Sequence, residues 1–336
     1  MSLERFIRAA PKVELHLHIE GTLEPELLMA LAERHAIALP YTDIGQVRKA
    51  YRFTDLQSFL DIYYQGAAVL LDAEDFEQLT WAYLRRMAAE NVRHVEIFFD
   101  PQTHTDRGVE FDTVVDGIAD ALRRAERELG ITSGLIACLL RHLGPASAEP
   151  TVDAILRRAD VIVGLGLDSS ERGYPPEPFA PLFQRARVHG LRTVAHAGEE
   201  GPADYVRGAL DALQVERIDH GNRALEDPAL VARLAATRVP LTVCPLSNVA
   251  LRVVEQLEHH PLRRLLDAQI VATVSSDDPA YFGGYLTDTL VQVTAALDLE
   301  QVEVMTLLRN SIEASFASPA RKRALLDELT TVSAII

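Results

Sequence analysis

Cysteine is scarce in this sequence, with only Cys138 and Cys244 among 336 residues. Two cysteines cannot build the disulfide framework on which many small secreted domains depend, so we expect a reducing compartment, the cytoplasm. The first eleven residues include Glu4 and Arg8 and lack the apolar core of a signal peptide. Runs of about 18 apolar residues are also missing, so no segment is expected to span a membrane.

Positive charge is in short supply, and lysine is the rarer of the two strongly basic residues. The chain has 33 Lys and Arg against 49 Asp and Glu, which gives a formal net charge of −16. A surface this acidic argues against a nucleic acid polymer or an anionic membrane as the partner. The lysines are Lys12, Lys49 and Lys322, so the stretch from residue 50 to residue 321 contains none.

Low-complexity segments, internal repeats and a Pro/Gly/Ser-rich linker are absent as well. Hydrophobic residues make up 48% of the chain and charged residues 24%, the composition of an ordinary globular protein. The length by itself suggests about two domains, but a single α/β barrel also reaches this size. Without a linker, we expect one domain over residues 1–336.

The sequence does contain a series of short apolar, β-branched runs that alternate with amphipathic stretches. Such alternation is typical of parallel strands joined by crossover helices, and eight strands indicate a (β/α)8 barrel, the TIM barrel. The expected strands are Val13–His18, Val92–Phe99, Ile131–Leu140, Val161–Leu167, Leu191–His196, Val215–His220, Pro240–Val243 and Ile270–Ser275.

The gap between the first two expected strands is too long for one crossover helix. We therefore expect residues 22–91 to hold extra helices inserted into the barrel after its first strand. Within this insertion, apolar residues recur at helical spacing. They indicate a helix packed on the barrel, an apolar lid over its mouth, or both at once; the residues are Phe53, Leu56, Phe59, Leu60 and Tyr63.

Polar residues gather at the carboxyl ends of the expected strands, the face where barrel enzymes carry their active sites. His16 and His18 end the first strand two residues apart, so their imidazoles point to one side and suit a shared metal ion. A polar strand end explains this pair equally well on its own. Three more expected strands end in groups of the same kind, at His196, at Asp219-His220 and at Asp277-Asp278-Pro279.

Each of these groups also has a purely structural explanation. Asp278 before Pro279 fits the start of a helix, and Glu199 fits an acid favoured by a helix dipole. His196 fits a buried histidine bonded to the backbone. The joint occurrence of all of them at strand ends favours a metal-dependent site.

These residues stand in motifs that resemble the adenosine/adenine deaminase branch of the amidohydrolase superfamily. The motifs occur in the family's order and run from the first to the last expected strand, so the resemblance covers nearly the whole chain. They are Lys12-Val13-Glu14-Leu15-His16-Leu17-His18-Ile19-Glu20-Gly21, His196-Ala197-Gly198-Glu199, Asp219-His220-Gly221, Cys244-Pro245-Leu246-Ser247-Asn248 and Ser276-Asp277-Asp278-Pro279.

The resemblance implies a (β/α)8 barrel with one catalytic zinc ion per chain. By motif, Glu199 matches the acid that protonates the purine N1, and His220 matches the histidine that orients or deprotonates the attacking water. Asp278 matches the carboxylate that contacts the purine N7. The implied zinc ligands are His16, His18, His196 and Asp277.

The chemistry of these residue types agrees with those roles. Three neutral imidazoles and one carboxylate leave Zn²⁺ with a net positive charge, which activates water for attack on C6 of the purine. Attack is easier once N1 accepts a proton, so Glu199 has to be protonated when substrate binds. We therefore expect burial to raise the pKa of Glu199.

The rarity of lysine distinguishes this chain from binuclear relatives in the superfamily. Those enzymes often bridge two metal ions with a carboxylated lysine on the fourth strand, and Val161–Leu167 contains no lysine. A lysine-bridged centre is therefore excluded. The zinc deaminase fold marked by His-x-Glu together with Pro-Cys-x-x-Cys is not indicated either, because the chain has no Pro-Cys-x-x-Cys.

Glu20 bears on the choice of purine. Adenosine deaminases usually have Asp here, where it helps to hold ribose, and the longer Glu20 is expected to reach into the ribose space or to bond the N9 edge of a free base. The stretch around Ser169 and Ser170 resembles the adenine-specific group. Ser169, Ser170 and Glu171 are expected to line the N3 side of the purine, although an ordinary loop is the alternative.

The sequence thus predicts a zinc-dependent adenine deaminase of purine salvage that converts adenine and water to hypoxanthine and ammonia. An adenosine deaminase and a deaminase of N6-substituted adenines are the alternatives. A barrel that binds purine or metal without turnover is disfavoured, because binding alone needs no general acid beside a metal. The oligomeric state stays open, with a homo-oligomer among the possibilities.

Overall fold

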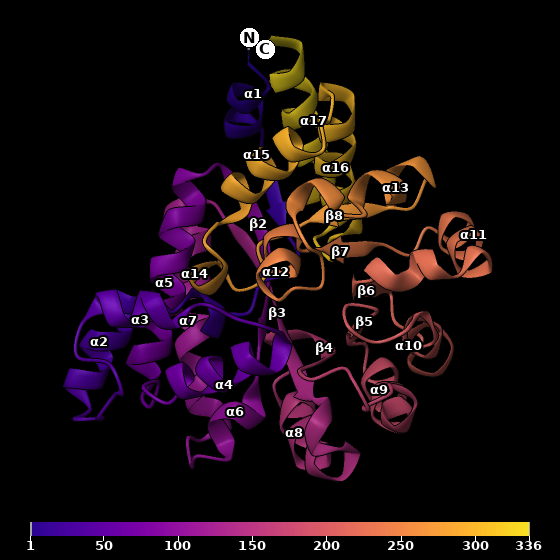
Figure 1. Ribbon diagram of the computed structural model, residues 1–336. Helices are drawn as coiled ribbons and strands as arrows, with labels where there is room; N and C mark the ends of the chain where they lie inside the picture. Colours follow the sequence, from indigo (N-terminus) through magenta and orange to yellow (C-terminus); the bar gives the residue numbers. More distant parts are fainter. Residues whose placement is uncertain (1, 336) are drawn as a thin grey trace.

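Eight parallel strands form the centre of the molecule and neighbour one another in sequence order (Figure 1). The computed structural model describes residues 2–335. Helices surround the strands, so the predicted (β/α)8 barrel is confirmed. The strands are β1 (Lys12–Glu14), β2 (Val92–Phe99), β3 (Thr132–Leu140), β4 (Ile162–Asp168), β5 (Arg192–Ala197), β6 (Arg217–His220), β7 (Leu241–Val243) and β8 (Ala272–Val274).

The barrel closes beside the His-x-His motif. Leu17 pairs with Asp277 in a single parallel bridge beyond the ends of β1 and β8. The amide of Asp277 donates to the carbonyl of His16, and the amide of His18 donates to the carbonyl of Asp277, each over 3.1 Å. The expected strand Val13–His18 is thus a three-residue strand followed by bridges, and these bonds hold its two histidines against the end of β8.

Four α-helices and a 3-10 turn lie between β1 and β2, where the sequence predicts extra helices. Helix α4 begins with a capping box, in which Asp55 accepts from the amide of Ser58 and the Ser58 hydroxyl accepts from the amide of Asp55. The Asp43 side chain caps α3 by accepting from the amide of Gln46. The elements are η1 (Glu20–Thr22), α2 (Pro25–Arg34), α3 (Ile44–Ala50), α4 (Leu56–Ala67) and α5 (Ala73–Ala89).

Helix α7 (Phe111–Leu129) shows how the outer helices pack on the barrel. Glycine at position 117 lets α7 approach α5, because a Cβ there would stand 2.2 Å from the carbonyl oxygen of Ala73. Gly130, at a φ of 68°, ends the helix in the left-handed conformation. Buried apolar residues recur every three or four positions along the inner face, at Val114, Ile118, Leu122 and Ala125.

The remaining helices complete the outer layer, and the two ends of the chain lie side by side near α1 and α17 (Figure 1). Within residues 2–335, none of the helices combines the length and apolar character that a membrane span needs. These helices are α1 (Leu3–Ala9), α6 (Pro101–Thr105), η2 (Arg141–Leu143), α8 (Pro145–Arg157), η3 (Glu177–Phe179), α9 (Ala180–Val188), α10 (Ala203–Gly208), η4 (Ala209–Leu213), η5 (Asn222–Glu226), α11 (Pro228–Thr237), α12 (Pro245–Ala250), η6 (Leu257–His259), α13 (Leu262–Asp267), α14 (Pro279–Phe282), α15 (Leu286–Ala296), α16 (Gln301–Ala314) and α17 (Pro319–Ile335).

A buried ion pair fills the barrel interior near the start of β6. Arg217 Nη1 donates to Glu96 Oε2 over 2.5 Å, and neither side chain is exposed. Arg217 also donates to the carbonyl of Leu15, and the backbone amide of Phe316 donates to Glu96. Burial raises the pKa of Glu96, but Arg217 and His94 together outweigh that effect and lower the pKa to about 2.

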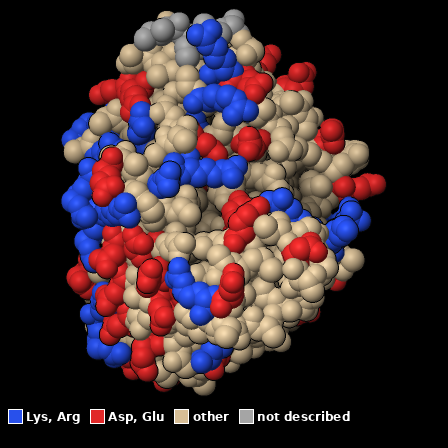
Figure 2. All heavy atoms as spheres, turned by 90° about the vertical axis from the view of Figure 1, so that its left-hand side faces the viewer, with Lys and Arg blue, Asp and Glu red and all other residues tan. Residues whose placement is uncertain are grey.

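Charged side chains of both signs are interspersed over the face of the molecule shown in Figure 2. On this face of the described chain, no continuous basic surface follows the outline of a nucleic acid backbone.

Candidate active site

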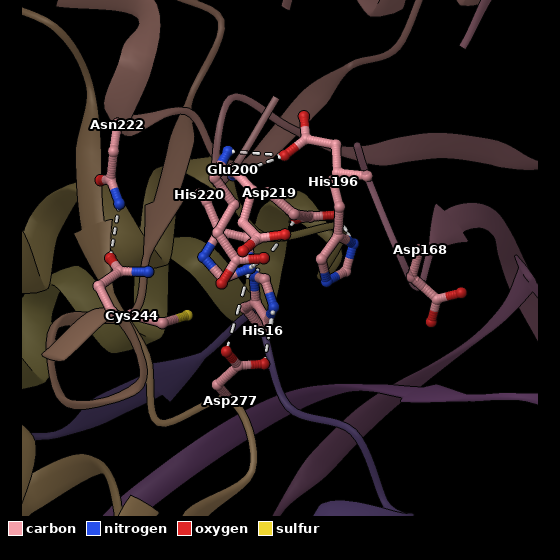
Figure 3. A network of polar contacts seen from close by, with 12 residues as sticks. His16, Asp168, His196, Glu200, Asp219, His220, Asn222, Cys244 and Asp277 are labelled. Atoms are coloured by element: carbon pink, nitrogen blue, oxygen red, sulfur yellow. Dashed lines mark hydrogen bonds and ion pairs between the residues drawn. The ribbon is translucent and has the colours of Figure 1, made fainter. Parts of the chain in front are cut away.

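Three histidines and one aspartate bring their side chains together at the carboxyl end of the barrel. His16, His196 and Asp277 of this group are labelled in Figure 3. One ligand atom from each of the four lies within 4.8 Å of the others, and all four residues are buried. His18 Nε2 lies 3.2 Å from His196 Nε2, and His16 Nε2 lies 3.2 Å from Asp277 Oδ1. The four are His16, His18, His196 and Asp277, the set that the sequence predicts as metal ligands.

This donor set fits a zinc ion. Zinc prefers imidazole nitrogen and carboxylate oxygen and binds four donors in a tetrahedral arrangement, or three with one position left for water. His16 Nε2 is buried and accepts or donates no hydrogen bond among the described residues. Such a buried nitrogen, turned toward three other donor groups, is suited to bind a metal ion.

A second layer of hydrogen bonds holds His16 in place. Its Nδ1 lies 2.9 Å from the hydroxyl of Thr242 on β7, and that hydroxyl donates to Asp219 on β6 over 2.8 Å. The other oxygen of Asp219 lies 3.8 Å from Nδ1 of His196. The hydrogen bonds through Thr242 fix the orientation of the His16 ring in the way that metal sites commonly do, while the contact of Asp219 with His196 is electrostatic.

Three site residues that are not glycine adopt left-handed backbone conformations. The φ angles are 70° for Ser169, 65° for His220 and 66° for Asp277. Residues with a Cβ rarely adopt this region, and the strain is tolerated where the surrounding structure over-determines it. Ser169 directly follows β4, His220 ends β6 and Asp277 comes three residues after β8, so the strain accompanies the turn of the chain into the site.

Glu199 and His220 lie beside the ligand group and face each other, with Oε2 of the carboxyl 3.6 Å from Nε2 of the imidazole. Burial, reinforced by Asp277 and other nearby acids, raises the pKa of Glu199 well above its ordinary value. Burial and the charge of His16 lower the pKa of His220 to about 3. The two shifts therefore favour the protonated form of Glu199 and the uncharged form of His220.

A small enclosed cavity of about 40 Å³ lies above these groups, and helix α4 covers it. Leu56, Phe59, Leu60 and Tyr63 of α4 line it, so the insertion contributes the apolar lid that the sequence left as one of two interpretations. The same side chains of α4 share a buried apolar cluster with Tyr281 and Phe282. The helix therefore also packs on the body of the protein, the other interpretation of its apolar residues. The cavity meets an outer hollow of about 810 Å³, with Glu199 and Leu251 lining both.

The likeness to known proteins extends over nearly the whole chain. A profile of the adenosine deaminase family matches residues 11–332. The adenine deaminase of Rhodospirillum rubrum is 56% identical over 328 residues, which cover 98% of this chain and 98% of that protein. The chain belongs to the adenosine deaminase family.

Solved structures of related proteins share the same architecture. The adenine deaminase of Arthrobacter aurescens superposes with a TM-score of 0.95 at 55% identity, covering 97% of this chain and 100% of that one. An amidohydrolase from Burkholderia ambifaria with bound zinc superposes with a TM-score of 0.90 at 28% identity, covering 99% and 94%. The resemblance read from the sequence motifs is thereby confirmed.

Two of the residues expected to touch substrate line the cavity, Asp278 and Ser169. Asp278 Oδ1 is buried without a hydrogen-bond partner in the described chain. Glycine at position 21 makes room for Asp278, because a Cβ there would stand 2.0 Å from Oδ1. The Ser169 hydroxyl lies 2.9 Å from that of Tyr64 and 2.8 Å from Nδ1 of His142.

Glu20 and Ser170 do not line the cavity. Ser170 is turned outward and donates to Gln57. The expected strand does not continue to Glu20, because the chain enters the turn η1 there and the alternation that aligns His16 with His18 stops. The Glu20 carboxylate is buried and is fully engaged by protein donors: the amide of Asp100, the imidazole of His104 and the hydroxyl of Tyr63.

Asp100 and Asp168 form a buried acidic pair at one end of the cavity. Asp168 Oδ2 lies 3.6 Å from Nδ1 of His18, and the Tyr63 hydroxyl donates to Asp100 over 3.1 Å. Burial, followed by the charges of Asp168 and Glu20, raises the pKa of Asp100 well above its ordinary value. The position of Asp100 directly after β2, at the carboxyl end of a barrel strand, is the sequence signal that marks it.

Proposed function

We propose that this protein is an adenine deaminase, in which water displaces the 6-amino group of adenine to give hypoxanthine and ammonia. The observation that carries the proposal is the opposed pair Glu199 and His220 beside the histidine–aspartate cluster. A protonated acid and a neutral base next to a metal site are the groups that hydrolytic deamination requires. Relatives named adenine deaminase at more than half identity over nearly the whole chain support the choice of substrate.

We propose zinc as the metal, one ion per chain, held by the cluster of His16, His18, His196 and Asp277. The donor chemistry supports zinc, and so does the bound zinc of the related amidohydrolase. Zinc held there would supply Lewis-acid activation of the water that attacks C6. Strand β4 contains no lysine, which fits a single-metal centre rather than a lysine-bridged pair.

The side chains of the protein supply the proton transfers. Glu199, protonated because of its burial, donates to N1 as the water oxygen bonds to C6, so that negative charge does not build up on the ring. His220, uncharged, accepts a proton from the attacking water and returns it to the departing amine. The C6–N6 bond breaks and ammonia leaves. As the C6 carbonyl forms, the second proton of the water passes to the Glu199 carboxylate and restores the acid, while the proton on N1 remains in the product.

The order of polar groups around the barrel matches the order of atoms around a purine. Asp278 follows β8, Asp100 follows β2, Ser169 follows β4 and Glu199 follows β5. N7, N9, N3 and N1 occur in the same cyclic order on the ring. A purine with N1 at Glu199 and N7 at Asp278 therefore turns N3 toward Ser169 and N9 toward Asp100, and its C6 faces His220.

The surroundings of N9 favour a free base over a nucleoside. Glu20, Tyr63, Asp100 and His104 form one buried, mutually bonded group where a ribose on N9 would have to pass. Glu20 thus acts on specificity by holding Asp100 and Tyr63 in place. Ser170 supports the pocket from its outer side, because its hydrogen bond to Gln57 connects the loop after β4 to the lid helix α4. We place the enzyme in the cytoplasm, in line with its two free, buried cysteines.

The test is product formation by metal-defined protein. Protein stripped with a chelator and reconstituted with zinc, iron or manganese is given adenine, and ammonia and hypoxanthine are quantified together. We expect both products in equal amounts, strict dependence on added metal, and one zinc ion per chain at full activity. Equal activity of the stripped protein would contradict the metal assignment, and absence of hypoxanthine with every metal would contradict the reaction.

A further inference from the structure

The carboxylate of Glu171, in the loop after β4, is surrounded by backbone amides of the loop after β5. It accepts hydrogen bonds from four consecutive amides, those of residues 198–201. The amide of Gly198 bonds to Oε1 over 2.5 Å, and the other three bond to Oε2 over 2.8 to 3.0 Å. Glu171 is only 1% exposed, so water does not compete for these amides.

The loop that Glu171 binds is the one that carries Glu199. Four bonds to one carboxylate fix the backbone on both sides of Glu199, and with it the direction in which the Glu199 side chain leaves the loop. Two glycines make this wrapping possible. Gly198 has a φ of 76°, and a Cβ at Gly201 would stand 2.6 Å from the carboxylate of Glu171. The loop is thus shaped around the anion.

A buried arginine also holds the two loops together. Arg141, at the end of β3, has no exposed surface. It donates to the carbonyl of His196 over 2.7 Å and to that of Tyr174 over 2.7 Å. It therefore ties the end of β5 to the loop that contains Glu171, and the electrostatic field of Glu171 stabilises its charge.

We propose that Glu171 is a positioning residue for the acid Glu199: its carboxylate sets the backbone of residues 198–201 so that the Glu199 carboxyl meets the purine N1. This inference rests on the proposed role of Glu199. The hydrogen bonds of the Glu171 carboxylate go to the backbone of the loop that carries Glu199, and Glu171 does not line the cavity. Loss of this alignment is expected to slow proton transfer to N1 more than it weakens the binding of the purine by the rest of the pocket.

The test compares catalysis with the binding of an analogue that lacks N1. In 1-deazaadenine a C–H group replaces N1, so its inhibition constant measures the pocket without the contact to Glu199. Glu171→Gln keeps the shape but places an amide donor against the backbone amides. We expect kcat for adenine to fall by about 10²-fold, the inhibition constant for 1-deazaadenine to change less than about twofold, and the zinc content to stay at one per chain.

Glu226→Gln is the matched control. Glu226 pairs with Arg223, which donates to the carbonyl of Glu200 in the same loop, but it bonds none of the four amides. We expect this variant to keep wild-type kcat. If Glu171→Gln does not fold, Glu171→Asp retains the charge with a shorter reach and supplies the same comparison.

A double-mutant cycle separates positioning from a general structural role. In a Glu199→Gln background, adding Glu171→Gln is expected to lower kcat by less than about twofold, because the group that Glu171 positions is already gone. The inference is overturned if kcat is unchanged in the single variant, if 1-deazaadenine binding weakens as much as kcat falls, or if the two losses multiply. The effect of Glu199→Gln alone, measured beside it, tests the proposed function independently.

Discussion

Glu199 and His220 face each other with 3.6 Å between carboxyl oxygen and imidazole nitrogen, and their pKa values are shifted in opposite directions. Burial favours the protonated form of the carboxyl and the uncharged form of the imidazole. An acid that holds its proton and a base that has none are the two forms that the proposed reaction needs. The division of roles in the proposed mechanism follows from this relationship.

We expect Glu199→Gln to lower kcat/KM for adenine by about 10²- to 10⁴-fold, the range in which a general acid contributes. The glutamine keeps the shape and cannot transfer the proton. Steady-state ultraviolet assays measure the loss, and zinc analysis serves as the control, because Glu199 is not a proposed ligand. An active variant with unchanged kcat would contradict the role of Glu199.

The pH profile follows from the same shift and checks the same residue. Because the pKa of Glu199 is raised, its protonated form persists well above pH 4.5, and kcat/KM is expected to fall only as the pH rises through the raised value. The residual activity of Glu199→Gln should lack this alkaline limb. A limb that persists unchanged in the variant belongs to another group.

We expect Thr242→Val to weaken zinc binding by about 10- to 100-fold, the usual cost of losing an outer partner of a metal ligand. The hydroxyl of Thr242 connects Nδ1 of His16 to Asp219. Competition with a chromophoric chelator measures the affinity. Thr273→Val on β8 is the control, since its buried hydroxyl makes no hydrogen bond in the described structure. Equal affinities for the two variants would argue against a role for the Thr242 link.

Glu20→Asp tests how the enzyme excludes ribose. The shorter side chain withdraws from His104, Tyr63 and the amide of Asp100, and it opens the space beside N9. We expect the ratio of kcat/KM for adenosine to that for adenine to rise by about tenfold, the effect of a modest change in pocket contacts. Glu24→Asp, on the partly exposed N-cap of α2, is the control. An unchanged ratio would contradict a role for Glu20 in the discrimination between adenine and adenosine.

The buried pair Glu96–Arg217 predicts how stability depends on pH. The pKa of Glu96 is lowered from 4.5 to about 2, so its ionised form contributes stability that is complete above about pH 4.5 and lost as the pH falls through about 2. Glu96→Gln is expected to lower the free energy of unfolding by roughly 3 kcal/mol at pH 7. Denaturant titrations at pH 7 and pH 3 measure it, and a difference between wild type and variant that grows toward low pH would contradict this account.

Much of the fold was predictable because each strand is a short apolar run that ends in a polar group. All eight predicted strands occur, and seven keep their general place. The first is shorter than Val13–His18 because the chain leaves the regular ladder to bring its histidines against Asp277. The barrel is closed between its first and last strands by an isolated bridge between Leu17 and Asp277, which are 260 positions apart. The local sequence carries no signal for such a long-range pairing.

In the site, the motifs identified the groups that converge, but not the residues that hold them. His16, His18, His196 and Asp277 meet as the spacing indicates, while the assignment of the individual roles stays a prediction. Glu20 was expected at the substrate because of the resemblance, but the chain enters the turn η1 there and the Glu20 carboxylate is bonded by protein donors instead. A polar residue inside the short apolar strand β7 is the one sequence signal for Thr242, since it has to face the barrel interior.

The central claim is that the protein deaminates the free base, and a direct comparison of substrates tests it. Zinc-loaded protein is assayed by ultraviolet absorbance with adenine, adenosine and N6-methyladenine under identical conditions, and kcat/KM is determined for each. The account predicts that kcat/KM for adenine exceeds that for adenosine by at least about 10²-fold, because ribose on N9 meets the buried group around Asp100. Equal values for adenine and adenosine, or a higher value for N6-methyladenine, would contradict it.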